Sequence, residues 1–261
     1  PTYSGYRYRE EMQRFETWFP LMEKLYVNSP SDNEHYAHLA LRHWVGFLKQ
    51  TGTSARGPKD YFIPLDLGCR AICLPEDFAH WIQSEHMTPE VYSATLKYLW
   101  KNVYEMTVNN FLLNDQNNAG IVGARGLHTI NCFFNEFRIY ERALEKVRTK
   151  LDSIAKSSLI NDDGSYGEAS LAYAGMSTNN TLGYIKPNTM TGNPDLPFRD
   201  EDYFDDARKI GLYLINACAP GMRDNQWGDG AAYSSQYIST LTSINKEFDD
   251  PYIKYFVTEG K

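Results

Sequence analysis

Cysteine and histidine are the residue types that most often bind metals or act as nucleophiles and bases. This chain of 261 residues contains four cysteines and six histidines. Cys69 and Cys73 are four residues apart, which places them on one helical face but is not a CxxC spacing. Neither paired CxxC motifs nor HExxH occurs. We therefore expect reduced, buried thiols, no metal and no cofactor. The remaining residues of these types are Cys132, Cys218, His35, His38, His43, His80, His86 and His128.

Composition narrows the classes of partner. Aromatic residues make up 14% of the chain, and their faces stack on sugar rings, although large cores use them too. The net charge of −7 argues against a nucleic-acid binder, which usually has a basic surface. It allows a local basic cleft for an anionic polymer. No apolar run of roughly 18 residues exists, so we expect no membrane span. The polar start at Pro1 fits a mature or trimmed protein. We expect a secreted or periplasmic location.

Helical periodicity dominates the chain, and strand-like alternation is almost absent. The pattern predicts an all-α fold, an incomplete (α/α) toroid of antiparallel helix pairs in one domain over residues 1–261. A solenoid of helix pairs is the alternative, but no fixed repeat period is found. Apolar spacing, cap-type residues and prolines predict helices over residues 10–26, 34–49, 65–83 with a break at Pro75, 90–111, 121–134, 136–158, 202–217 and 234–248.

Two polar segments between the helices are distinctive. Residues 161–164, Asn-Asp-Asp-Gly, predict a turn. Residues 178–197 are rich in Asn, Pro, Gly and Thr and predict a long irregular loop. Such a loop in a compact domain is usually functional or mobile. We therefore expect it to border a cleft and to move.

Three stretches, in order, resemble the polysaccharide lyases of the heparinase II/III type. Residues 64–70 are similar to an early helix that ends in an arginine. Residues 117–120, Asn-Asn-Ala-Gly, precede a helix that a Phe-Asn-Glu-Phe corner closes at residues 134–137. Residues 163–173 are similar to a segment with Asp-Gly-Ser, Glu, Ser and Tyr. A weaker match is residues 228–251. The segment 163–175 also echoes the chondroitin AC and hyaluronate lyases, whose catalytic Tyr would fall at Ser177.

The resemblance implies cleavage of a uronic-acid glycan by β-elimination, with this acidic polysaccharide as the partner. A base removes the C5 proton, a donor draws charge from the neighbouring carboxylate, and an acid protonates the leaving oxygen. Asn118 suits the donor, because its amide donates two hydrogen bonds and never titrates. An ordinary helix cap is the alternative. Tyr173 suits the acid, and also the base if a nearby cation assists it.

Four further residues are implied as substrate-binding. Asn117 replaces Asn118 if the alignment slips by one residue. Arg70 and Arg125 are candidates for the cation that assists Tyr173, or for pairing with substrate carboxylates through the guanidinium fork. The alternative is that each forms a surface or structural ion pair. Glu168 orients the site, or it satisfies backbone donors in its turn. None of the six histidines follows the Asn, so the base is left open.

Two departures from the family pattern keep other functions in view. The family often has His after the Asn, and this chain has Ala119. The family's toroid is followed by a β-sandwich, so we expect the chain, which ends at Lys261, to be a piece of a longer protein or to need a second chain. A hydrolase with two carboxylic acids, drawn from Asp66, Glu168 and Asp229, is one alternative. A non-catalytic glycan-binding module is the other, since fold does not fix function.

Overall fold

The computed structural model describes residue 15 and residues 18–51, 64–108, 117–155, 160–167, 170–182, 202–217 and 234–258. The regular secondary structure of these residues is helical, apart from one isolated antiparallel bridge between Ile160 and Tyr166. The chain forms two compact units: unit 1 holds residues 1–112 and 126–144, and unit 2 holds residues 113–125 and 145–261. Helices α6 (Asn118–Phe133) and α7 (Ile139–Ala155) contribute to both units. The single domain expected from the sequence stays a prediction.

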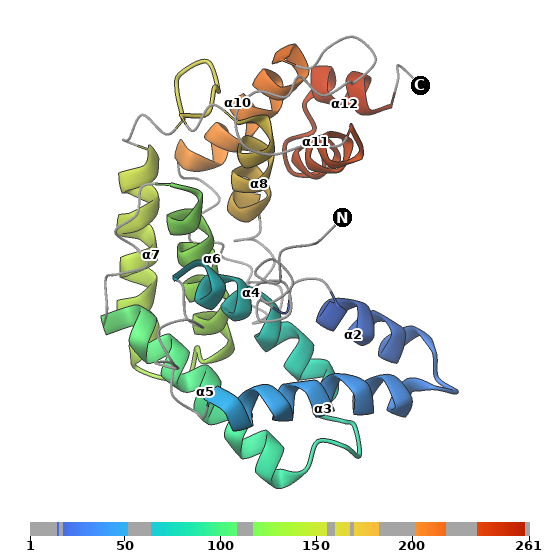
Figure 1. Ribbon diagram of the computed structural model, residues 1–261. Helices are drawn as coiled ribbons and strands as arrows, with labels where there is room; N and C mark the ends of the chain where they lie inside the picture. The colour runs from blue at the N-terminus through green and yellow to red at the C-terminus, as the bar shows by residue number, and fades with distance from the viewer. Residues whose placement is uncertain are drawn as a thin grey trace, which may run out of the picture. The chain divides into compact units, whose positions relative to one another are not determined.

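Unit 1 is built around helices α2 (Trp18–Asn28), α3 (Asn33–Thr51), α4 (Pro64–Trp81) and α5 (Pro89–Val108). Helix α2 packs against α3 and α4, and α4 packs against α5 (Figure 1). Trp44 Nε1 on α3 donates to Thr95 Oγ1 on α5 at 2.8 Å. Gly126 lets α6 approach α4 closely, because a Cβ there would lie 2.6 Å from the backbone oxygen of Gly68.

The start of α2 differs from the helix predicted over residues 10–26. Phe15 is not helical: its φ is 61°, a conformation that costs a non-glycine residue about 1–2 kcal/mol. Its ring is fully buried against aromatic neighbours, with the ring centroids of Trp44 and Phe47 at 5.4 Å and 5.1 Å. Burial of this aromatic side chain offsets the backbone cost. The helical conformation predicted for this residue is therefore wrong.

The predicted break at Pro75 is also wrong, because α4 runs without interruption from Pro64 to Trp81. A proline inside a helix removes one backbone hydrogen bond and crowds the preceding turn. Leu74, Phe78 and Trp81 are buried around it. Their packing holds the helix together at a position where local preference alone would end it.

Unit 2 contains helices α8 (Leu171–Leu182), α10 (Asp202–Ala217), α11 (Ser234–Phe248) and α12 (Pro251–Val257). Helix α8 packs against α10 and α11, and α12 packs against α10 and α11 (Figure 1). The core between them is aliphatic and includes Ala207, Ile210, Leu214, Leu241, Ile244 and Ile253. The bounds predicted for α10 and α11 are confirmed. The other predicted helices are present with ends shifted by a few residues.

Helix α8 corrects the loop predicted over residues 178–197. Its last five residues, 178–182, are helical, and residues 183–201 lie outside the described part of the chain. The polar side chains of this turn have defined partners. Asn180 Nδ2 donates to the Met176 carbonyl at 2.9 Å, and Asn179 Nδ2 donates to Thr240 Oγ1 on α11 at 3.0 Å. Tertiary hydrogen bonds thus stabilise a helix that composition alone would not predict.

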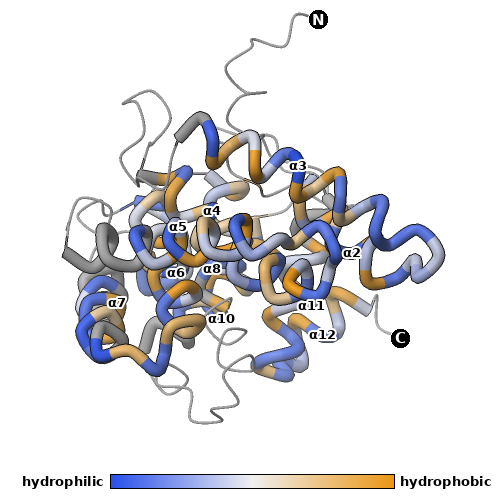
Figure 2. Tube along the Cα trace, turned by 90° about the horizontal axis from the view of Figure 1, so that it is seen from below, coloured by the Kyte–Doolittle hydropathy of each residue, from blue (hydrophilic) through white to orange (hydrophobic). Residues whose placement is uncertain are grey.

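The helices are amphipathic, as expected for elements that cover a core on one side. Polar and apolar residues alternate along α3 and α7 (Figure 2). Among the described residues, no helix is both long enough and apolar enough to cross a bilayer.

Candidate active site

The two asparagines at the start of α6 have different roles. Asn117 precedes the helix, and its Oδ1 accepts a hydrogen bond from the Gly120 N–H at 3.2 Å, while its backbone oxygen accepts from Ile121 N–H at 3.3 Å. These are the contacts of an N-cap residue. Asn118 is the first residue of the helix and is half-buried. The cap considered for Asn118 is therefore supplied by Asn117, and the donor role of Asn118 stays a prediction.

Tyr173 lies in the first turn of α8, where its side chain is half-buried. Ser170 caps this helix: its Oγ accepts from the Tyr173 N–H at 3.3 Å, and its carbonyl accepts from the Ala174 N–H at 2.9 Å. Ser170 is buried. This helix start was not predicted, although a serine directly before an apolar residue is a usual signal for the start of a helix.

A hydrogen bond joins the two helices that carry these residues. Arg125 Nη1 on α6 donates to Asn180 Oδ1 on α8 at 3.2 Å. Asn118 lies seven residues before Arg125, and Tyr173 lies seven residues before Asn180. A spacing of seven returns to the same helical face after two turns, about 10.5 Å along the axis. Both candidates therefore lie on the joined faces of their helices.

The two helices run in the same direction. In Figure 1 both begin at their upper ends, and these first turns belong to unit 2. Asn180 was not predicted as part of the site, because its polar neighbourhood predicts a loop.

Arg70 lies on α4 in unit 1 and is fully buried. Its guanidinium carbon lies 5.5 Å from the centroid of the Phe47 ring, a cation–π contact. This burial favours the structural alternative for Arg70, and its contact with substrate stays a prediction.

The Asp-Gly-Ser motif forms a tight turn, as predicted for residues 161–164. Gly164 has a φ of 83°, and its N–H donates to the Asn161 carbonyl at 2.8 Å. The Ser165 N–H donates to Asp163 Oδ1 at 2.9 Å. This backbone bond, followed by the hydrogen bond of the Ser165 side chain, lowers the pKa of Asp163. These contacts assign the motif a structural role in shaping the approach to α8.

The turn is also anchored to the helices of unit 2. The Ser177 hydroxyl on α8 donates to the Tyr166 hydroxyl at 2.8 Å, and Tyr166 is buried. A Cβ at Gly164 would collide with the backbone oxygen of Lys209 on α10. Ser177, where the chondroitin-type pattern would require the catalytic Tyr, therefore takes part in buried structural bonding.

The Phe-Asn-Glu-Phe corner closes α6 through packing. Phe134 and Phe137 lie against Trp100 on α5, with ring centroids at 5.5 Å and 5.0 Å. The Phe137 N–H donates to the Phe134 carbonyl at 3.0 Å, which turns the chain towards α7. The corner is thus an architectural feature and supplies no group for chemistry.

Cys69, Cys73 and Cys132 are thiols in the structure. Burial raises the pKa of Cys132 to about 12, and its sulfur lies 3.8 Å from Nε2 of the buried His128. This thiol is therefore protonated at neutral pH and is a poor nucleophile. Glu168, Asp229 and Cys218 lie outside the described residues, so the roles predicted for them stay predictions.

The sequence matches the profile of a family described as heparinase II/III N-terminus over residues 2–255. A comparison with curated proteins finds no significant match. Among solved structures, heparan sulfate lyase HepC from Pedobacter heparinus has a TM-score of 0.72 and 20% identity over 96% of this chain. A heparinase III has a TM-score of 0.80 and 18% identity over 98% of this chain.

These likenesses confirm the resemblance seen in the motifs and the expected all-α toroid fold. A third structure, a heparinase III gene product with methylated lysines, agrees with a TM-score of 0.70 and 19% identity over 95% of the chain. The chain spans 39% or 40% of the length of these proteins.

Proposed function

Because this chain belongs to the heparinase II/III N-terminus family, whose profile matches residues 2–255, we propose that it is the helical part of a polysaccharide lyase acting on a uronic-acid glycan. The reaction is β-elimination across the linkage at C4. Two of the similar structures are described as heparan sulfate lyases, which makes heparan-type chains the first substrates to test. A polymeric substrate of this kind also favours a secreted or periplasmic location.

The observation that carries the proposal is the hydrogen bond from Arg125 to Asn180. Its two residues each lie seven positions after a candidate, Arg125 after Asn118 on α6 and Asn180 after Tyr173 on α8. Both helices begin at their upper ends in Figure 1. One uronate ring placed between the helix starts would present its carboxylate to α6 and its C4 oxygen to α8.

The start of α6 suits the developing negative charge. The helix dipole places partial positive charge at the start of α6, where Asn118 lies. The Asn118 amide adds a donor that keeps its charge state at every pH. As the C5 proton leaves, charge grows on the carboxylate and a hydrogen bond from this amide strengthens. The side chain of Ala119 supplies no base, so another group removes the C5 proton.

Tyr173 is placed to protonate the leaving oxygen. A tyrosine hydroxyl can donate a hydrogen bond, and the Ser170 cap fixes the turn from which the side chain projects. Arg125 acts as a positioning residue, because its hydrogen bond to Asn180 sets the spacing of the two helices.

The test follows the ultraviolet absorbance of the unsaturated product over heparan, chondroitin, hyaluronan and alginate polymers. It uses this chain and, in parallel, the complete gene product that contains it. Asn118→Ala should lower kcat about 10²–10³-fold with little effect on binding. Tyr173→Phe should lower kcat about 10²–10⁴-fold. Asn28→Ala, at the exposed end of α2, and Tyr92→Phe, stacked on Phe78, are matched controls that should retain activity.

Other outcomes would replace the proposal. New reducing ends without unsaturation would identify a hydrolase. Saturable glycan binding without cleavage would identify a binding module. Full activity in Asn118→Ala or Tyr173→Phe would refute the roles of those residues.

A further inference from the structure

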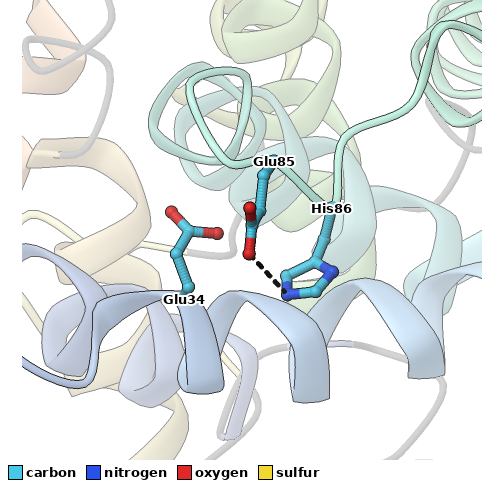
Figure 3. A group of neighbouring side chains, drawn as sticks. All are labelled: Glu34, Glu85 and His86. Carbon is cyan, nitrogen blue, oxygen red and sulfur yellow. Dashed lines mark ion pairs between the residues drawn. The ribbon is translucent and has the colours of Figure 1, made fainter.

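A cluster of three metal-binding side chains lies in unit 1, away from the residues proposed for the lyase reaction. Glu34 projects from the first turn of α3, and Glu85 and His86 belong to the turn between α4 and α5 (Figure 3). A carboxylate oxygen of each Glu and a ring nitrogen of His86 lie within 4.8 Å of one another. His86 Nε2 is 3.9 Å from Glu85 Oε1.

Two of the three side chains are carboxylates, and like charges held this close repel each other unless a cation lies between them. A divalent cation bound at the cluster would remove this repulsion.

The cluster has a supporting residue behind it. Ser84 is 5% exposed, and its hydroxyl donates to Glu34 Oε2 at 2.7 Å. The same oxygen of Ser84 accepts the His86 N–H at 3.2 Å. One buried hydroxyl thus orients Glu34 and fixes the backbone that carries His86. Hydrogen bonds of this kind commonly hold metal ligands in place.

A second imidazole lies beside the first. His38 follows Glu34 by one helical turn on the same face of α3. Its ring centroid is 4.7 Å from that of His86. The His38 side chain is exposed and can rotate.

The geometry points to a divalent transition-metal site, best fitted to Zn²⁺, with Glu34, Glu85 and His86 as ligands and His38 available for the fourth position. Calcium and magnesium prefer oxygen ligands alone, whereas zinc takes imidazole together with carboxylate. Donor atoms around tetrahedral zinc lie about 2.0–2.2 Å from the metal and therefore roughly 3.4 Å from one another. Rotation of the exposed Glu85 side chain closes the remaining gap.

Such an ion would fasten two separate parts of unit 1. It would tie the start of α3 to the turn between α4 and α5, which Ser84 already joins through a hydrogen bond. Because the ion binds the folded cluster, the melting temperature would rise as the free Zn²⁺ concentration rises above the dissociation constant. The site therefore has a structural readout that is independent of lyase activity.

The test titrates Zn²⁺ into the chelator-treated 261-residue chain by calorimetry, with metal content measured by mass spectrometry. We expect one Zn²⁺ per chain and a higher melting temperature. Glu34→Gln and His86→Ala should each lower affinity more than 100-fold, beyond the range of about 10–100-fold usual for loss of a supporting residue. The loss of zinc affinity in Ser84→Ala should fall within this range of about 10–100-fold. Co²⁺ in place of Zn²⁺ should give a d–d spectrum that His86→Ala abolishes.

The matched control is His80→Ala. His80 is also in unit 1 and pairs with Glu23 at 2.8 Å, so its loss removes an imidazole–carboxylate contact outside the cluster. It should leave zinc affinity unchanged. Binding that does not saturate at one ion per chain, or that survives in His86→Ala, would reduce the cluster to a surface ion pair and overturn the proposal. Equal losses of zinc affinity in His80→Ala and His86→Ala would also overturn the proposal.

Discussion

Asp250 joins two helices of unit 2, and its replacement by alanine tests how that unit is held together. One carboxylate oxygen, Oδ1, accepts the N–H groups of Tyr252 and Ile253 at 2.9 Å and 3.1 Å and so caps α12. The other, Oδ2, accepts Nε and Nη2 of Arg208 on α10 at 2.8 Å and 2.7 Å. Asp250→Ala removes the cap and the ion pair together.

The expected cost follows from these contacts. Loss of an N-cap costs about 1 kcal/mol. Breaking a buried ion pair costs about 3–5 kcal/mol, but the Arg208 side chain is 40% exposed, so solvent screening reduces this part to about 1–2 kcal/mol. The free energy of unfolding should therefore fall by about 2–3 kcal/mol, roughly 30–150-fold in the folding equilibrium.

The pH dependence has a definite sign. Burial alone would raise the pKa of Asp250, but the N–H of Ile253, the Arg208 guanidinium and the N–H of Tyr252 together hold it below its usual value. A carboxyl group with a lowered folded pKa stabilises the fold above its unfolded pKa of about 3.9. This contribution is lost as the pH falls through the folded pKa. The difference between wild type and Asp250→Ala should then shrink.

Urea denaturation at neutral pH and at pH values below about 4 measures both effects. The assay includes Arg208→Ala and the double variant, whose coupling free energy should be about 1–2 kcal/mol. Asp250→Asn should keep the cap oxygen and lose mainly the ion pair. A coupling near zero, or a stability difference that does not change as the pH falls, would refute this account of Asp250.

Three other predictions concern single positions. Gly164→Ala should lower the free energy of unfolding by at least about 2 kcal/mol, because φ is positive at this residue and the new Cβ would collide with the backbone of α10. Gly175→Ala is the control in a comparison of thermal melts and should not lower stability, because its new Cβ would make only an ordinary contact at 3.6 Å. Thr95→Val should cost about 1–3 kcal/mol in urea denaturation by leaving Trp44 Nε1 buried without its acceptor, and Thr95→Ser should recover most of it. Cys132, with a pKa raised to about 12 by burial, should react with iodoacetamide only in unfolded protein, and rapid labelling of native protein in a mass-spectrometric assay would contradict this.

Local pattern predicts most of the helices of this fold because most of them have amphipathic sequences and conventional ends. Helices α10 and α11 have the predicted bounds, and the turn at residues 161–164 forms as expected. Helix α12 was not predicted, although Asp250 followed by Pro251 is a usual signal for a helix start. The family was also predicted from ordered motifs, and the profile match confirms it.

The errors occur where tertiary contacts override local preference. Phe15 takes a positive φ because an aromatic cluster buries its ring. Pro75 stays within α4 because buried neighbours hold the helix on both sides. For the candidate site, the sequence proposed Asn118 and Tyr173, but it did not show that Asn117 provides the cap or that Asn180 joins the two helices. Such pairings depend on contacts between residues distant in the chain.

The polar second half of α8 has a consequence for how unit 2 opens in solution. The segment from Ser177 to Thr181 consists of residues with weak helix propensity, and its asparagines are bonded to Arg125 and Thr240 on other helices. An isolated peptide of this sequence would be mostly unfolded. The amide hydrogens of α8 should therefore exchange with solvent only when the helices packed against it separate. Their exchange rates should match those of the amide hydrogens of α10 and α11, and fraying of α8 alone should not contribute. The turn that holds Tyr173 would then be as long-lived as the core beneath it.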